Sequence, residues 1–543
     1  MEPLSVTNDI AIDTSSLLTI LGVIAAVWAI IPANNRLRFR LSVTWLDWLI
    51  VIVVFLIAHY LVFKRALDAV GLYYSFGPWK WGLDKGSAVY LLLLALGFYL
   101  LARARSPKLA RQNVGTFGKL VDNLLLTKRY DELVSLVEPQ LSKLLKLSQH
   151  RPLLARVAAK FAPKPVFNFE VLLHGEPVRR DLKAKHYDRS RLSQFETFLL
   201  KRDHASRHAN EILQSISNDP ALVAHLAVTH PYLCLSLLER PQAMREDLIE
   251  LFMDALLADH TSRIYVELKN NQNQKGRHRL ALPESNRILC FFFKDVSVAA
   301  KLGLYRAIGE SVCRTLDEDQ RLAEAYNSPL GYYNEVGKYR CPVHAGIKLF
   351  EIMVHEGIHQ GQQDHLWLFY FTHFTTRILK QMREASPDDE YHEWPTPFYY
   401  LLYEIVRIAS NWVEDCVEIK TQDIPESTRE QKDFDLFYIS RQATIALGSI
   451  VQDIVQSSKV ADGFKDYVLE IVLRRYKHIE RDPQTMQVAN DLVRSLTVGA
   501  DFPTKIEYRY ALQRGFDRLD HVLPREVPKF ASAIKMSLQD SAA

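Results

Sequence analysis

Three long apolar stretches near the amino terminus constrain this chain more than any other feature of its sequence. They cover residues 17–33, 45–63 and 88–102, and each is close to the roughly 20 residues that a helix needs to cross a bilayer core. Trp45, Trp48 and Tyr90 lie near their ends, where amphipathic rings favour the headgroup layer. We therefore predict a membrane domain, residues 1–111, with three transmembrane helices.

Basic residues follow the first and the third of these stretches. Arg36, Arg38 and Arg40 come after the first, and Arg103 and Arg105 come after the third. Because lysine and arginine are retained on the cytoplasmic side of a membrane, both clusters predict the same topology. We expect a multi-pass protein of the cell membrane, in contact with the lipid bilayer, with its amino terminus outside and everything after about residue 103 in the cytoplasm.

The rest of the chain shows mainly the period of amphipathic helices, with apolar residues three and four positions apart. The clearest examples are residues 133–145, 193–215, 245–257, 398–417 and 442–455. Strand signals are few, and the best are residues 166–173 and 263–268, each consistent with a short hairpin or an extended loop. The predicted fold class is mainly α: three N-terminal transmembrane helices are followed by a large, mostly helical cytoplasmic region, for which stacked helix pairs are one arrangement.

Composition and polar loops define this region further. A polar run at residues 270–279 places a domain boundary near residue 283, which gives two helical cytoplasmic domains, 112–283 and 284–543. The net charge of +4 is a weak basic excess, so no nucleic acid is expected as a partner. The five cysteines are odd in number and widely spaced, which argues against a disulfide framework and favours a reducing compartment.

The sharpest chemical signal is the pentapeptide His355-Glu356-Gly357-Ile358-His359. Residues four apart share one face of a helix, so both imidazoles could ligate one Zn²⁺. Glu356 would then be placed to act as general base on a metal-bound water, whose pKa the ion lowers to about 7.

A third ligand is needed, and the sequence leaves its identity open. His365 follows His359 by six residues, a spacing that resembles the three-histidine pattern of metzincins, although Gln362 stands where that family has glycine. A glutamate from a later helix would resemble the gluzincins instead. Glu414 and Glu418 are possible donors of this kind, since they share one face of a predicted helix.

Two functions compete for this sequence. The leading hypothesis is a membrane-anchored helical cytoplasmic module that binds protein partners, with assembly into a homo-oligomer as one option, without catalytic activity and without an expected cofactor. In it, residues 349–382 form one or two core helices, and His355 and His359 simply form hydrogen bonds at a domain interface. The alternative is a membrane-tethered zinc metallopeptidase with a protein substrate. In it, Glu356 is catalytic, and the zinc ligands are His355, His359 and either His365 or a later glutamate such as Glu414.

Overall fold

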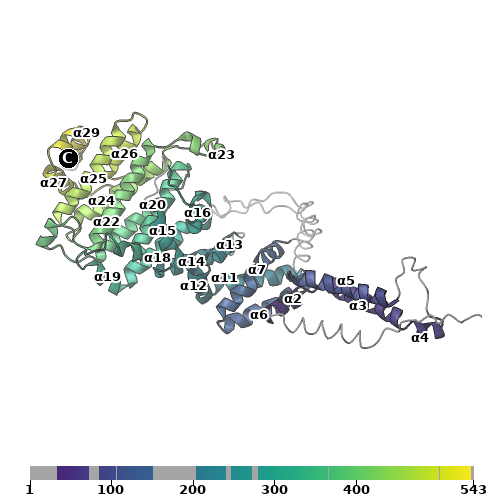
Figure 1. Cartoon of the computed structure of the whole chain (residues 1–543). Coiled ribbons are helices and arrows are strands. Elements are labelled where there is room, and N and C mark those ends of the chain that lie inside the picture. The colour runs from purple at the N-terminus through teal and green to yellow at the C-terminus, as the bar shows by residue number, and fades with distance from the viewer. Residues whose placement is uncertain are drawn as a thin grey trace, which may run out of the picture. The chain divides into compact units, whose positions relative to one another are not determined.

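The computed structural model describes residues 33–72, 85–105, 107–150, 203–239, 246–271, 279–364, 366–500 and 502–539. Throughout these ranges the secondary structure is helical and contains no β-strand (Figure 1), which confirms the mainly α prediction. The chain divides into two compact units, Met1–Ile216 and Ser217–Ala543. The divisions predicted at residues 111 and 283 fall within these units and stay predictions.

The helices of the first unit are α2 (Ala33–Ser42), α3 (Trp45–Val62), α4 (Lys64–Ala69), α5 (Lys85–Arg105), η1 (Arg111–Asn113), α6 (Val114–Leu126) and α7 (Tyr130–Ser148), and α11 (His204–Asn218) crosses the division.

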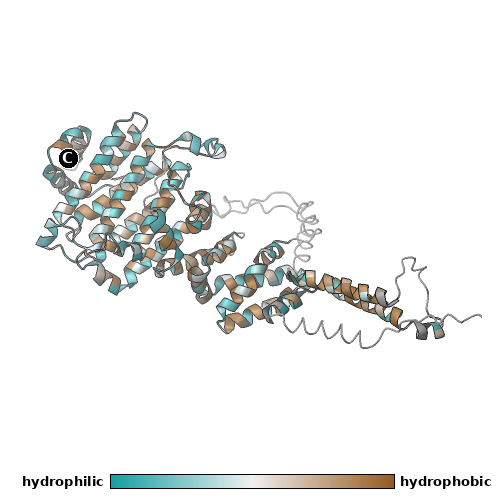
Figure 2. Ribbon diagram, in the orientation of Figure 1, coloured by the Kyte–Doolittle hydropathy of each residue, from teal (hydrophilic) through white to brown (hydrophobic). Residues whose placement is uncertain are grey.

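Two of these helices, α3 and α5, are long and apolar enough to cross a membrane. They pack against each other and are the most continuously apolar helices in Figure 2. Only 17% of the α3 span and 11% of the α5 span are buried within the protein, so most of their apolar side chains face outward, as lipid-facing residues do. The first predicted stretch, residues 17–33, lies outside the described residues.

Polar groups gather at the end of this pair where α3 begins and α5 finishes. Thr44 caps α3, and Asp47 completes a reciprocal capping box with it. Asp47 also accepts a hydrogen bond from Tyr99 and lies 3.5 Å from Arg103, whose guanidinium donates to the Ser42 carbonyl at 3.0 Å. Asp47 therefore has a local structural role as a helix cap.

The elements of the second unit are α12 (Pro220–Thr229), α13 (Pro231–Leu238), α14 (Glu246–Ala258), α15 (Arg263–Asn271), α16 (Arg287–Phe293), α17 (Val296–Leu302), α18 (Leu304–Glu318), α19 (Gln320–Tyr326), η3 (Gly337–Arg340), α20 (Pro342–His359), η4 (Leu366–Leu368), α21 (Phe369–Gln381), η5 (Pro387–Tyr391), α22 (Pro397–Glu414), η6 (Asp415–Val417), η7 (Thr421–Asp423), α23 (Glu426–Arg429), α24 (Tyr438–Gln456), α25 (Asp462–Glu480), α26 (Met486–Thr497), α27 (Ile506–Arg518), α28 (Val522–Glu526) and α29 (Pro528–Gln539).

The core of the second unit lies where α18, α20, α21, α22 and α24 pack against one another. Large aromatic side chains fill it: Phe350, Phe371 and Trp412 are fully buried, and the rings of Phe371 and Trp412 lie 4.4 Å apart. The pair α12 and α13 is apolar enough for one further span but bends by 118°, and its leucines are buried in this helical body. All five cysteines of the chain are free thiols.

One local expectation is wrong. Residues 263–268 carry a strand signal, but they form the first part of α15. Ile264 and Tyr265 are buried, and the Tyr265 hydroxyl donates to the Leu257 carbonyl at 2.6 Å, so packing against the neighbouring helices overrides local strand propensity. The other strand signal, residues 166–173, lies outside the described residues.

Candidate functional site

The His-Glu-x-x-His motif occupies the last turns of α20. Pro342 begins this helix, which then runs without interruption to His359. It ends there because Gly361 adopts a left-handed conformation, with φ of +70°, and the Gln362 amide donates back to the Gly357 carbonyl at 2.9 Å. His355 and His359 therefore lie on one face of a well-formed helix, as the motif predicts.

The structure brings an aspartate to these two histidines. Nδ1 of His355 lies 2.8 Å from Oδ2 of Asp415, at the start of η6, and the two imidazole rings have their centroids 4.5 Å apart. The side chains of His355 and Asp415 are 18% and 16% exposed, whereas His359 is fully buried. The cluster is thus closed on the side of His359 and reaches solvent on the side of Asp415.

This cluster has the donor types of a zinc site. One ligand atom from each of His355, His359 and Asp415 lies within 4.8 Å of the other two. Around a tetrahedral Zn²⁺, ligand atoms are about 3.4 Å apart. Side-chain rotations that move the ligand atoms by about 1 Å would therefore bring all three within bonding distance of one ion. Asp415 can serve as the third ligand, or it can hold the Nδ1 proton of His355 and direct Nε2 toward the metal.

Glu356, the predicted general base, is engaged elsewhere. It is 1% exposed, and its Oε2 accepts hydrogen bonds from Nε and Nη2 of Arg279, at 2.8 and 2.5 Å, and from Nε2 of Gln360 at 3.0 Å. Its Oε1 accepts from the Leu280 amide at 3.0 Å. Both carboxylate oxygens therefore already have donors, which ties the motif to the segment before α16.

Gln360 extends this connection. Its side-chain oxygen accepts from the amide of Val296, the first residue of α17, at 2.9 Å, and its nitrogen donates to the Phe293 carbonyl at the end of α16 at 3.1 Å. The polar residue that follows the second histidine thus joins three helix ends.

Gly357 is required by packing. A Cβ atom at this position would lie 2.8 Å from Cζ3 of Trp367 and 3.3 Å from Cδ1 of Ile439. The small residue in the middle of the motif therefore allows a buried tryptophan to lie directly against α20.

The other candidate ligands lie apart from the cluster. Glu414 contacts α25 instead: its carboxylate is 2.7 Å from Nδ1 of His478 and 2.7 Å from Nη1 of Arg475. Glu418 is exposed, and the α-helix ends at Glu414, so the expected common face with Glu418 does not form. His365 lies outside the described residues.

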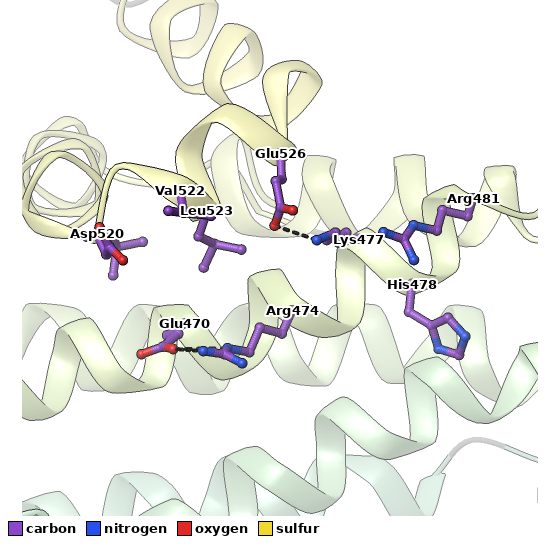
Figure 3. A pocket seen from close by; sticks show the side chains of 10 residues that line it. Glu470, Arg474, Lys477, His478, Arg481, Asp520, Val522, Leu523 and Glu526 are labelled. Carbon is purple, nitrogen blue, oxygen red and sulfur yellow. Dashed lines mark hydrogen bonds and ion pairs between the residues drawn. The ribbon is translucent and has the colours of Figure 1, made fainter.

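A second polar site is a groove of about 540 Å³ between α25 and α28. Four of its charged side chains form two pairs within the groove, as Figure 3 shows: Arg474 contacts Glu470, and Lys477 contacts Glu526. His478 lines the same groove while contacting Glu414. This mutual neutralisation leaves the groove without a strong charge preference for a ligand.

Comparison of the chain with protein-family models, with curated proteins and with solved structures finds no match in any of the three. The site must therefore be interpreted from its own geometry. Sequence reasoning missed two residues of this site. Asp415 directly follows Glu414, which was already a candidate ligand, so the sequence did point to this region. Arg279 is 77 positions from Glu356, and no local pattern indicates their contact.

Proposed function

We propose that this protein is a membrane-anchored helical module of the cytoplasmic side that binds one divalent metal ion, best fitted by Zn²⁺, at His355, His359 and Asp415. The metal has a structural role, and the helical body binds protein partners, a second copy of the chain among the candidates. The observation that carries the proposal is the convergence of three ligand-type side chains beside a glutamate whose oxygens are already occupied.

The orientation of the anchor is supported by its charge. The start of α3 and the end of α5 are at the same end of the helix pair, since Asp47 on α3 contacts Tyr99 and Arg103 on α5. The arginines of α2, which precedes α3, and of the last turn of α5 therefore lie at this same end of the helix pair, where the chain continues into the rest of the protein. Under the positive-inside rule this end is cytoplasmic.

Zinc is favoured by its ligand chemistry. Neutral imidazole and carboxylate suit Zn²⁺, whereas Ca²⁺ and Mg²⁺ require six or more oxygen ligands or several waters. A non-catalytic role is favoured by Glu356. A general base must accept a proton from a water within hydrogen-bonding reach, but this carboxylate accepts from an arginine, an amide side chain and a backbone N–H.

The test is the metal content of the purified full-length protein in detergent after exposure to zinc and removal of the excess. We expect about one zinc per chain in the wild type, and loss of it in His359→Ala and in the nearly isosteric Asp415→Asn. His373→Ala, which removes an exposed histidine from α21, is the matched control and should retain the metal. A wild type that takes up no zinc, or a His359→Ala variant that keeps it, would refute the proposal.

A zinc peptidase remains the second candidate, and one observation favours it. His355 and Asp415 are partly exposed, so a fourth coordination position can face solvent, as in catalytic zinc sites. This activity requires Arg279 to release Glu356. It predicts chelator-sensitive cleavage of an unfolded protein substrate that Glu356→Gln abolishes while zinc content is unchanged. Equal cleavage by wild type and Glu356→Gln would remove this candidate.

A further inference from the structure

A polar seam runs between α20 and α22, and it starts well before the histidine motif. The two helices lie side by side in the same direction, because successive contacts advance together along both. The His344 and Tyr400 rings have centroids 6.4 Å apart, and Nζ of Lys348 lies 4.0 Å from the Glu404 carboxylate. One turn further, Arg407 of α22 contacts Glu351 of α20 at 3.2 Å.

At the first turns of this seam lies a cavity of about 220 Å³, which we call the seam cavity. It is separate from the histidine cluster, since His344 precedes His355 by 11 residues, or about 16 Å of helix. Its walls come from α15, η3, α20 and α22, and its lining residues are Tyr265, Leu268, Lys338, Tyr339, His344, Lys348, Tyr400, Glu404 and Arg407.

The charges around the seam cavity do not cancel. Arg407 contacts both Glu404, at 2.8 Å, and Glu351, at 3.2 Å, and Lys348 forms an ion pair with Glu351. Burial opposes the ionisation of Glu404, but Arg407 and the two lysines overcome this and lower its pKa, so it is anionic. With Lys338 included, three cations face two carboxylates.

Of these three cations, Lys338 is the one that contacts no carboxylate of the residues that the structure describes. Its Nζ donates to the neutral hydroxyl of Tyr400 at 3.1 Å and lies 5.3 and 5.5 Å from the ring centroids of Tyr339 and Tyr400. Burial lowers the pKa of Lys338, which means that its ammonium group lacks full compensation for the water it has lost. Nζ of Lys269 lies 5.6 Å from the Tyr339 ring centroid and adds positive charge nearby.

Three side chains that line the seam cavity, Lys338, Tyr400 and His344, can each donate a hydrogen bond to a ligand there. The ammonium of Lys338 has further protons beyond the one it gives to Tyr400, and the Tyr400 hydroxyl, having accepted that bond, can donate its own proton. His344 lines the cavity, and within the described part of the chain no hydrogen bond to its ring nitrogens is found. Because burial lowers the pKa of His344 to about 3, its ring is neutral and offers one N–H donor.

We propose that the seam cavity binds a small oxyanion, namely a phosphate group, through Lys338, Tyr400 and His344. An ammonium and neutral donors that converge in a partly dry site suit an anion of this kind. The volume limits the ligand, since sites for drug-sized molecules and cofactors are about 300–1,000 Å³. The ligand is therefore free phosphate or the phosphate group of a small monoester, and a nucleotide is too large to be enclosed.

The test is isothermal titration calorimetry of phosphate into the full-length protein in detergent, with ionic strength held constant and a chelator present. Chelation separates this site from the histidine cluster, so the proposal stands or fails independently of the proposed metal. We expect one saturable site in the wild type. Lys338→Met should weaken binding about tenfold or more, because it removes a charged donor but keeps the length of the side chain.

Two further variants keep the test decisive. Lys301→Met removes an exposed lysine from α17 and should bind phosphate like the wild type, and Tyr400→Phe keeps the ring but should bind several-fold more weakly. Tighter binding of glycerol phosphate than of inorganic phosphate would identify a monoester as the ligand, and the reverse order would identify free phosphate. No saturable heat in the wild type, or unchanged binding in both Lys338→Met and Tyr400→Phe, would overturn the proposal.

Discussion

Lowering the pH from 7 to 5 should destabilise the second unit through His344. This histidine is 6% exposed, and burial, together with the nearby charges of Lys348 and Lys338, lowers its pKa from 6.5 to about 3. Glu351 opposes this shift and Arg407 adds to it. The cause is physical: an imidazolium here would lose its hydration beside three cations.

The sign and size of the effect follow from proton linkage. Between pH 6.5 and about 3 the unfolded chain binds a proton at His344 and the folded protein does not, so stability falls as the pH falls through this window. Above pH 6.5 both states are neutral and nothing is lost. At pH 5, about one and a half pH units below the unfolded value, the loss is about 2 kcal/mol at about 1.4 kcal/mol per unit.

The assay is urea unfolding at pH 7 and pH 5, followed by the fluorescence of buried tryptophans such as Trp412. Other groups titrate over the same range, so the informative quantity is the difference between variants. The stability lost from pH 7 to pH 5 should be about 2 kcal/mol smaller in His344→Gln than in the wild type. His373→Gln, at an exposed site, should behave like the wild type. An equal loss in His344→Gln and wild type would refute this reasoning.

Three further single variants and one double variant test the packing around the motif. Gly357→Ala should destabilise the protein by about 1–2 kcal/mol in urea unfolding, since its Cβ would press on Trp367 and outweigh the gain in helix propensity; unchanged stability would contradict the close packing. Gly361→Ala should cost at least about 1–2 kcal/mol in the same assay, because φ is +70° there; an equally stable variant would mean that α20 ends differently. Arg279→Met should cost about 1–3 kcal/mol by leaving the Glu356 carboxylate without its cation, and adding Glu356→Gln should restore part of this loss; additive losses in the double variant would exclude the ion pair.

Much of the secondary structure could be predicted because it depends on neighbours within one or two turns. The pattern at residues 398–417 predicts a helix, and α22 occupies Pro397–Glu414; the pattern at 442–455 corresponds to α24, Tyr438–Gln456. Pro220 and Pro342 begin α12 and α20 as first-turn prolines do. The apolar spans at 45–63 and 88–102 correspond to α3 and α5 for the same reason.

The sequence alone thus determined two helices that are apolar enough to cross a membrane, a helical body and a helix that carries His355 and His359 on one face, because each of these depends on local spacing. Only the tertiary structure decided which groups meet them. It turned Glu414 toward α25 and placed Asp415 at His355, since the α-helix ends between these two acidic residues. It also set Arg279 against Glu356, a contact between distant positions that only packing could create.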